Sequence, residues 1–105
     1  MLLFDSHCHI DDPCFAADLD AMLERAQKAG VRAMAIAGVD TDTAQKAVNI
    51  AAGRDNVITA VGIHPHDATN CSDERISALE GIASGNPCVR AWGEAGLDFN
   101  RMYSP

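Results

Sequence analysis

Long apolar runs are missing from this chain of 105 residues. No segment approaches the roughly 20 apolar residues that a membrane span requires. The apolar start is interrupted at Asp5, which is too early for a signal peptide. We therefore expect a cytoplasmic protein with no membrane partner. Paired cysteines are missing too: the 4 cysteines are widely spaced without a C-x-x-C motif, which disfavours a disulfide framework.

Basic residues are also scarce, with 8 Lys and Arg against 15 Asp and Glu and a net charge of −7. Proteins that grip nucleic acid electrostatically rely on stripes of Lys and Arg, so a broad grip of that kind is not expected. A nuclease is still allowed, because metal ions neutralise phosphate locally and acidic residues gather around cations. No Gly-rich phosphate loop follows the first apolar run, which disfavours a nucleotide-binding domain.

What the chain does contain is an alternation of strand-like and helix-like segments, with 48% hydrophobic residues, enough for a packed core. Strand-like runs begin near Leu2, Val31, Val57 and Cys88. The two middle runs are almost continuously apolar, as in parallel strands buried on both faces. Helical spacing of apolar residues, which predicts core positions, ends at a glycine in each intervening segment. These positions are Leu19, Met22, Leu23, Ala26, Ala44, Ala47, Val48, Ala51, Ile76, Leu79, Ile82 and Ala83.

This alternation predicts right-handed βαβ units of roughly thirty residues and a parallel sheet. Four strands and three helices amount to half of an eightfold barrel of about 250 residues. Ser104 and Pro105 have the pattern of an N-cap and a first-turn proline, the opening of a fourth helix. We therefore predict an α/β fold, the N-terminal half of a TIM-type (β/α)8 barrel. Residues 1–105 would form a single partial domain, truncated at the start of the fourth helix.

Two histidines, His7 and His9, are separated by one residue at the end of the first strand-like run. Alternation along a strand places both on one face, about 7 Å apart, and sends Cys8 to the other face. Two neutral imidazoles side by side suit one divalent cation, whereas protonation would make a metal-free pair repel. We predict that His7 and His9 are metal ligands. A structural zinc site that adds Cys8 and Cys14 is a minor alternative.

Polar residues follow every predicted strand, at the edge where active sites of parallel α/β proteins form. They are Asp5, His7 and His9, then Gly38 and Asp40, then His64, His66 and Asp67, and finally Glu94 and Asp98. Glu94 ends an apolar strand between glycines, where burial is costly for an unpaired carboxylate. We predict that it is a metal ligand, able to bridge two cations, rather than part of a structural ion pair.

His64 and His66 flank Pro65, so their rings are expected to face the same opening. They are candidates to hold phosphate oxygens, to orient water or to support metal ligands. Alternatively, one of them caps the following helix or pairs with Asp67. Asp5 and Asp98 are candidates to orient a ligand histidine, or else they tie down their own loops. Asp40 is interpreted as turn or cap chemistry and Trp92 as core.

Four stretches together resemble the TatD-like metal-dependent deoxyribonuclease family, within the wider amidohydrolase-type barrel group. They are F-D-S-H-C-H-I-D-D at 4–12, A-G-V at 29–31, V-G-I-H-P-H-D at 61–67 and G-E-A-G-L-D-F-N-R at 93–101. The resemblance covers the whole chain in order, and the last two motifs are the most specific.

The resemblance implies a barrel that binds one to three divalent ions (Mg, Mn or Zn). His7 and His9 would be ligands of the first metal, Glu94 the catalytic carboxylate shared between metals, and His64 and His66 contacts of substrate phosphate. It implies hydrolysis of phosphodiester bonds by a metal-activated water, with exonuclease character on single-stranded DNA. The family's remaining ligands, two histidines and an aspartate, come from later strands.

Because those strands are absent from this sequence, we expect the chain alone to be inactive and at most a weak metal binder. Two alternatives stay open: an amidohydrolase-type enzyme with a non-nucleic substrate, and a non-catalytic half-barrel. The half-barrel would associate with itself or with a missing C-terminal half, because its sheet would otherwise expose long apolar edges.

Overall fold

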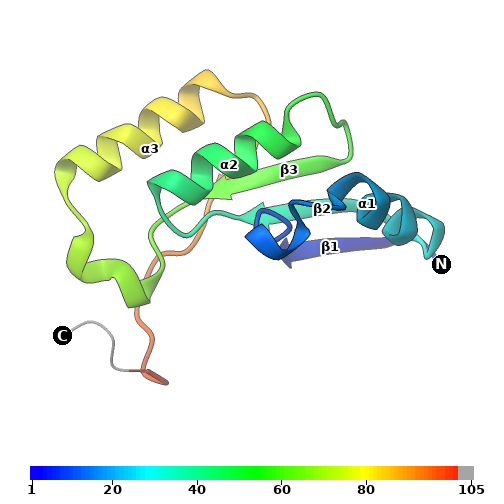
Figure 1. Cartoon of the computed structure of the whole chain (residues 1–105). Coiled ribbons are helices and arrows are strands. Elements are labelled where there is room, and N and C mark those ends of the chain that lie inside the picture. The colour runs from blue at the N-terminus through cyan, green and yellow to red at the C-terminus, as the bar shows by residue number, and fades with distance from the viewer. Residues whose placement is uncertain (102–105) are drawn as a thin grey trace.

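The computed structural model describes residues 1–101, which form one parallel sheet with three helices (Figure 1). The strands are β1 (Leu3–Cys8), β2 (Val31–Ala37), β3 (Val57–Val61) and β4 (Val89–Trp92). The helices are α1 (Leu19–Lys28), α2 (Thr41–Ala51) and α3 (Asp73–Gly85), with short 3-10 turns η1 (Pro13–Phe15) and η2 (Pro65–Asn70). Ser104 and Pro105, expected to open a fourth helix, lie outside the described residues.

The strands are ordered β1-β2-β3-β4, and each pairs in parallel with the next one along the chain. The helices that connect them lie on one face of the sheet (Figure 1). Sequential parallel strands with helices on a single face are the repeating unit of a (β/α) barrel, in which the other face becomes the interior. The predicted α/β fold with four parallel strands and three helices is therefore confirmed.

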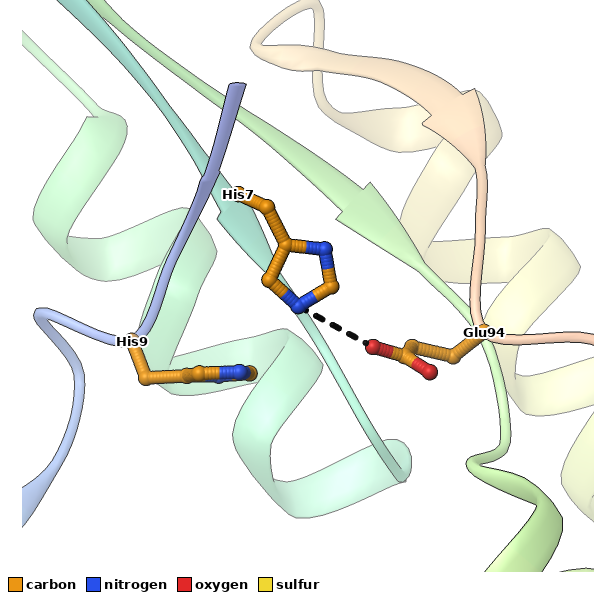
Figure 2. Close-up of side chains that lie close together, drawn as sticks. All are labelled: His7, His9 and Glu94. Atoms are coloured by element: carbon orange, nitrogen blue, oxygen red, sulfur yellow. Dashed lines mark ion pairs between the residues drawn. The ribbon is translucent and has the colours of Figure 1, made fainter. Parts of the chain in front are cut away.

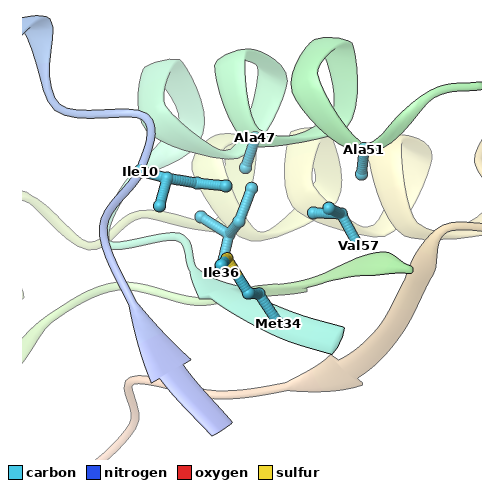
Figure 3. Close-up of a cluster of buried hydrophobic side chains, with 6 residues drawn as sticks. All are labelled: Ile10, Met34, Ile36, Ala47, Ala51 and Val57. Atoms are coloured by element: carbon cyan, nitrogen blue, oxygen red, sulfur yellow. The ribbon is translucent and has the colours of Figure 1, made fainter. Parts of the chain in front are cut away.

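The core lies between the sheet and the helices, and side-chain alternation along the strands builds it (Figure 3). One buried cluster joins strand and loop residues to the alanines of α2, and it consists of Ile10, Met34, Ile36, Ala47, Ala51 and Val57. A second cluster under α3 holds Ala44, Val61 and Leu79. Burial of β2 and β3 on both faces, expected from their apolar sequences, is only partly present. Their alternate residues on the helix-free face are mostly half-buried.

Helix ends follow local chemistry. Asp40 caps α2: its side chain accepts the Thr43 backbone N–H at 2.7 Å, and Thr43 completes a capping box. The interpretation of Asp40 as turn or cap chemistry is therefore confirmed. Gly30 follows α1 with a φ of 105°, as predicted for a C-terminal glycine.

Two expected core residues are exposed in this chain. Trp92 has 56% of its surface accessible and Ile76 has 39%, so placing them in the core was wrong for residues 1–101. Trp92 is the last residue of β4, which forms one edge of the sheet, and Ile76 of α3 lines the same hollow; no further element within the described residues covers them. Phe4, Leu97 and Phe99 are also more than half exposed. None of the helices in residues 1–101 is long and apolar enough to span a bilayer.

Candidate metal centre

His7, on β1, and His9, directly after it, are oriented by their apolar neighbours. Cys8 and Ile10 pack into the core on the helix side, so the intervening His9 and the preceding His7 face the opposite side. The Cys8 thiol donates a hydrogen bond to the Ala35 carbonyl at 3.3 Å, and burial raises the pKa of this thiol. Cys8 is therefore held away from the imidazoles, whose rings meet edge to face with centroids 5.2 Å apart.

Glu94, which follows β4, approaches this histidine pair from the opposite edge of the sheet. In a flat sheet β1 and β4 would lie three strand spacings apart, roughly 14 Å. Yet His7 Nε2 lies 3.4 Å from Glu94 Oε1, and both side chains point into the same space (Figure 2). The sheet must therefore curl, as it does in a barrel wall, so that the ends of its outer strands converge. One ligand atom from each of His7, His9 and Glu94 lies within 4.8 Å of the others.

A hollow of about 290 Å³ adjoins these groups on the helix-free face. His7 and Glu94 line it, and small side chains, including Ala35 and Ala60, line its floor. Alanines in these positions leave room for an ion and a bound group that larger side chains would fill.

The surroundings of Glu94 fit a cation. Its side chain is only 13% exposed, and within residues 1–101 its carboxylate accepts no hydrogen bond. Its nearest cationic candidates are His7 Nε2 and His64 Nε2, at 3.4 and 3.7 Å. A largely buried carboxylate without a hydrogen bond is unfavourable unless a positive charge approaches it. Two imidazoles and one carboxylate are a donor set that Zn²⁺ and Mn²⁺ accept.

His64 is held in one tautomer by the backbone. Its Nδ1 accepts the His66 backbone N–H at 3.0 Å, so in the neutral ring the proton resides on Nε2. That Nε2 lies 3.7 Å from Glu94 Oε2 and is a hydrogen-bond donor, not a free lone pair. The alternative interpretation of a helix cap also holds, because His64 caps η2 through this same bond.

His66 pairs with Asp98. The His66 Nε2 atom lies 2.5 Å from Asp98 Oδ2, and the His66 ring contacts the His64 ring at a centroid distance of 4.2 Å. The Asn100 backbone N–H donates to Asp98 at 2.7 Å, and this bond, with the His66 contact, lowers the pKa of Asp98. Asp5 instead accepts the backbone N–H of His7 at 3.2 Å and so fixes the strand end, not the ring.

One feature of this site was missed by sequence reasoning. Glu94 has a φ of 43°, the only positive φ at a non-glycine residue in residues 1–101. The segment after β4 that contains Glu94 lies against Gly62, the residue that follows β3. The only sequence signal was the glycine in V-G-I-H-P-H-D, which did not reveal which backbone passes beside it.

The fold and this donor set define a class: an α/β barrel-type protein with a candidate metal site at the carboxyl ends of its parallel strands. Residues 4–105 match the family described as TatD-related DNase, and the chain belongs to this family.

Similar proteins of known name carry the name of this family. The chain is 38% identical over 102 residues to the 3'-5' ssDNA/RNA exonuclease TatD of Cronobacter sakazakii, a match that covers 97% of this chain and 38% of the relative. The corresponding Erwinia amylovora protein is 37% identical over 103 residues, covering 97% and 39%. YJJV, a TatD homolog from Escherichia coli of known structure, superimposes with a TM-score of 0.83 at 31% identity, covering 92% of this chain and 38% of that protein. The chain thus spans under two fifths of the length of these relatives.

Proposed function

We propose that this chain provides part of the active site of a cytoplasmic, metal-dependent phosphodiester hydrolase that acts as an exonuclease on single-stranded nucleic acid. The observation that carries the proposal is the convergence of His7, His9 and Glu94, whose ligand atoms lie within 4.8 Å of one another. The relatives named as ssDNA/RNA exonucleases support the substrate class.

His7 and His9 would hold one divalent ion (Mg, Mn or Zn) from the β1 side, and Glu94 would hold it from the β4 side. The metal, when bound, would activate water and stabilise charge on the phosphoryl oxygens. Glu94 presents its two oxygens to different histidines, Oε1 to His7 and Oε2 to His64, so the two oxygens are directed at different parts of the site. This arrangement supports the predicted role of Glu94 as the shared, catalytic carboxylate.

His64 and His66 would contact the substrate phosphate. With its proton on Nε2, His64 can donate a hydrogen bond to a phosphoryl oxygen in the space beside Glu94. Asp98 would position His66 by holding its Nε2, and Asp5 would keep the end of β1 in place for His7. Neither aspartate lies in the three-residue metal cluster.

Three protein ligands leave the coordination of Mg²⁺, Mn²⁺ or Zn²⁺ incomplete. We therefore expect weak metal binding and no nuclease activity from the 105-residue chain alone. The exposed apolar residues Phe4, Trp92 and Phe99 support association with a further part of the barrel or a second copy. Size-exclusion chromatography tests this association: the chain on its own should elute larger than a monomer, and elution as a monomer would contradict self-association.

The site assignment is tested by titrating the chain with Mn²⁺ and Zn²⁺ in a calorimeter. Glu94→Gln should weaken binding by at least about tenfold, since it removes a charged ligand. Glu80→Gln, the same change on the exposed side of α3, should leave binding unaltered. Equal affinities of the Glu94→Gln variant and the unmodified chain would refute the site.

The substrate class needs a separate assay. The chain, with any associated barrel segment, is incubated with labelled single-stranded DNA and with a panel of amides and lactones, each with and without chelator. Release of nucleotides that chelator abolishes supports the nuclease. Chelator-sensitive turnover of an amide or lactone alone would favour the amidohydrolase alternative instead.

A further inference from the structure

Glu94 adopts a left-handed backbone conformation that L-residues rarely occupy, with a φ of 43°. Such a conformation persists only where the surrounding structure imposes it, and it is found most often at functional sites. The side chain of Glu94 is the one that joins β4 to the histidines of β1. What imposes this conformation therefore also determines where the carboxylate lies.

Backbone hydrogen bonds on both sides of Gly62 connect the end of β3 to the segment that contains Glu94. The Gly93 N–H donates to the Val61 carbonyl at 2.8 Å, and the Ile63 N–H donates to the Glu94 carbonyl at 3.1 Å. Between these two hydrogen bonds, the two backbone segments are in contact at Gly62. A Cβ atom at this glycine would lie 1.8 Å from the Gly93 carbonyl oxygen and 3.0 Å from that of Glu94.

We infer that Gly62 is a positioning residue for Glu94, an inference that rests on the proposed role of Glu94 as a metal ligand. Because Gly62 has no side chain, the Gly93–Glu94 backbone can lie against β3 and be held by the two flanking hydrogen bonds. The left-handed turn then directs the carboxylate back over the sheet towards His7 (Figure 2). Any side chain at residue 62 would collide with backbone atoms of Gly93 and Glu94, which cannot move aside as the end of a flexible side chain could.

The displacement is large on the scale of metal coordination. To relieve a contact of 1.8 Å, the two backbones must separate by about 1 Å before they reach 3.0 Å, the lower limit for real Cβ contacts. Ligand sets must be held to roughly 0.5 Å, so such a shift should take Glu94 out of the cluster. His7 and His9 lie on a different strand and should stay in place.

The test compares Gly62→Ala with Gly81→Ala in the 105-residue chain, each titrated with Mn²⁺ after circular dichroism has verified folding. Gly81 lies in α3, and a Cβ there would meet nothing within 4 Å. We expect Gly62→Ala to weaken Mn²⁺ binding by about tenfold or more, and Gly81→Ala to leave it unchanged. A purely structural role would lower the stability of Gly62→Ala while its folded molecules bind Mn²⁺ normally. That result would overturn the inference.

Two further measurements cover the other outcomes. If the unmodified chain binds no Mn²⁺, the metal-ligand assignment fails for the isolated chain, and a crystal structure of Gly62→Ala decides the positioning role. A Glu94 carboxylate displaced by about 1 Å supports that role, and one that has not moved overturns it. If Gly62→Ala does not fold, hydrogen exchange in the unmodified chain decides. Slow exchange of the Ile63 and Gly93 amides supports the two hydrogen bonds that hold the Gly93–Glu94 backbone against β3. Exchange at the rate of an open loop refutes the inference.

Discussion

The left-handed backbone at Glu94 leads to a sharp stability prediction, because glycine and alanine should reverse their usual order there. Glu94→Ala and Glu94→Gly both remove the carboxylate and its approach to His7 and His64. The two variants differ in one methyl group, which disfavours a positive φ of 43° in alanine but not in glycine. Comparing them isolates the backbone strain from the loss of the side chain.

The magnitude follows from two opposing effects. A left-handed conformation destabilises an L-residue by about 1–2 kcal/mol. Glycine is more flexible in the unfolded chain, which favours alanine by about 0.5–1 kcal/mol at an ordinary position. Subtracting the second range from the first leaves Glu94→Gly more stable than Glu94→Ala by up to about 1.5 kcal/mol, with a central value of about 0.75 kcal/mol. For a chain of this size the central value corresponds to roughly 3–6 °C in Tm.

Urea unfolding followed by circular dichroism measures both variants, and Gly81→Ala serves as the control. Residue 81 is in the interior of α3 with open space around it, so alanine should be the more stable residue there by about 0.5–1 kcal/mol. Alanine is thus expected to be more stable than glycine at residue 81 and less stable than glycine at residue 94. If Glu94→Ala proves as stable as Glu94→Gly or more so, the strain at residue 94 is not real and the reasoning fails.

Three further predictions concern the surrounding elements. Asp40→Ala should destabilise the chain by about 1 kcal/mol in thermal unfolding, since it removes the cap of α2, whereas Asp42→Ala in the same turn should have a smaller effect. His64 should show the ¹⁵N shifts of an Nε2–H tautomer in NMR spectra at pH 8, and an Nδ1–H signal would contradict the hydrogen bond from His66. The lowered pKa of Asp98 means that its contribution to stability is complete above the unfolded-state pKa near 3.8 and is lost as pH falls through the lower folded pKa. Unfolding measurements across this acidic range should therefore show the difference between the chain and Asp98→Asn shrinking towards low pH; a constant difference would contradict the lowered pKa of Asp98.

Much of the fold could be predicted because each signal was local. Apolar runs located the four strands, and a glycine such as Gly30 marked a helix end by its own backbone requirement. The exposure of Trp92 could not be predicted this way. An apolar residue is buried only if another element covers it, and which element covers β4 is not encoded near β4.

Part of the candidate site could likewise be predicted from the sequence, and part of it could not. Strand alternation was sufficient to place His7 and His9 on one face, and the parallel order of strands put Glu94 at the same edge of the sheet. The pairing of His66 with Asp98 depends on how a loop folds back over 32 residues. The contact at Gly62 depends on which backbone passes beside it. Neither is visible in residue spacing.

Metal binding should also stabilise the sheet in a way that reveals which residues hold the ion. A ligand that binds only the folded state adds about 2.7 kcal/mol at a hundred times its Kd. If Glu94 shares the ion with His7 and His9, the ion links the ends of β1 and β4, the two outer strands of the sheet. Hydrogen exchange should then slow in both strands when Mn²⁺ is added. An ion held by the two histidines alone would slow exchange at the end of β1 and leave β4 unchanged, because no bond to the ion would restrain that strand.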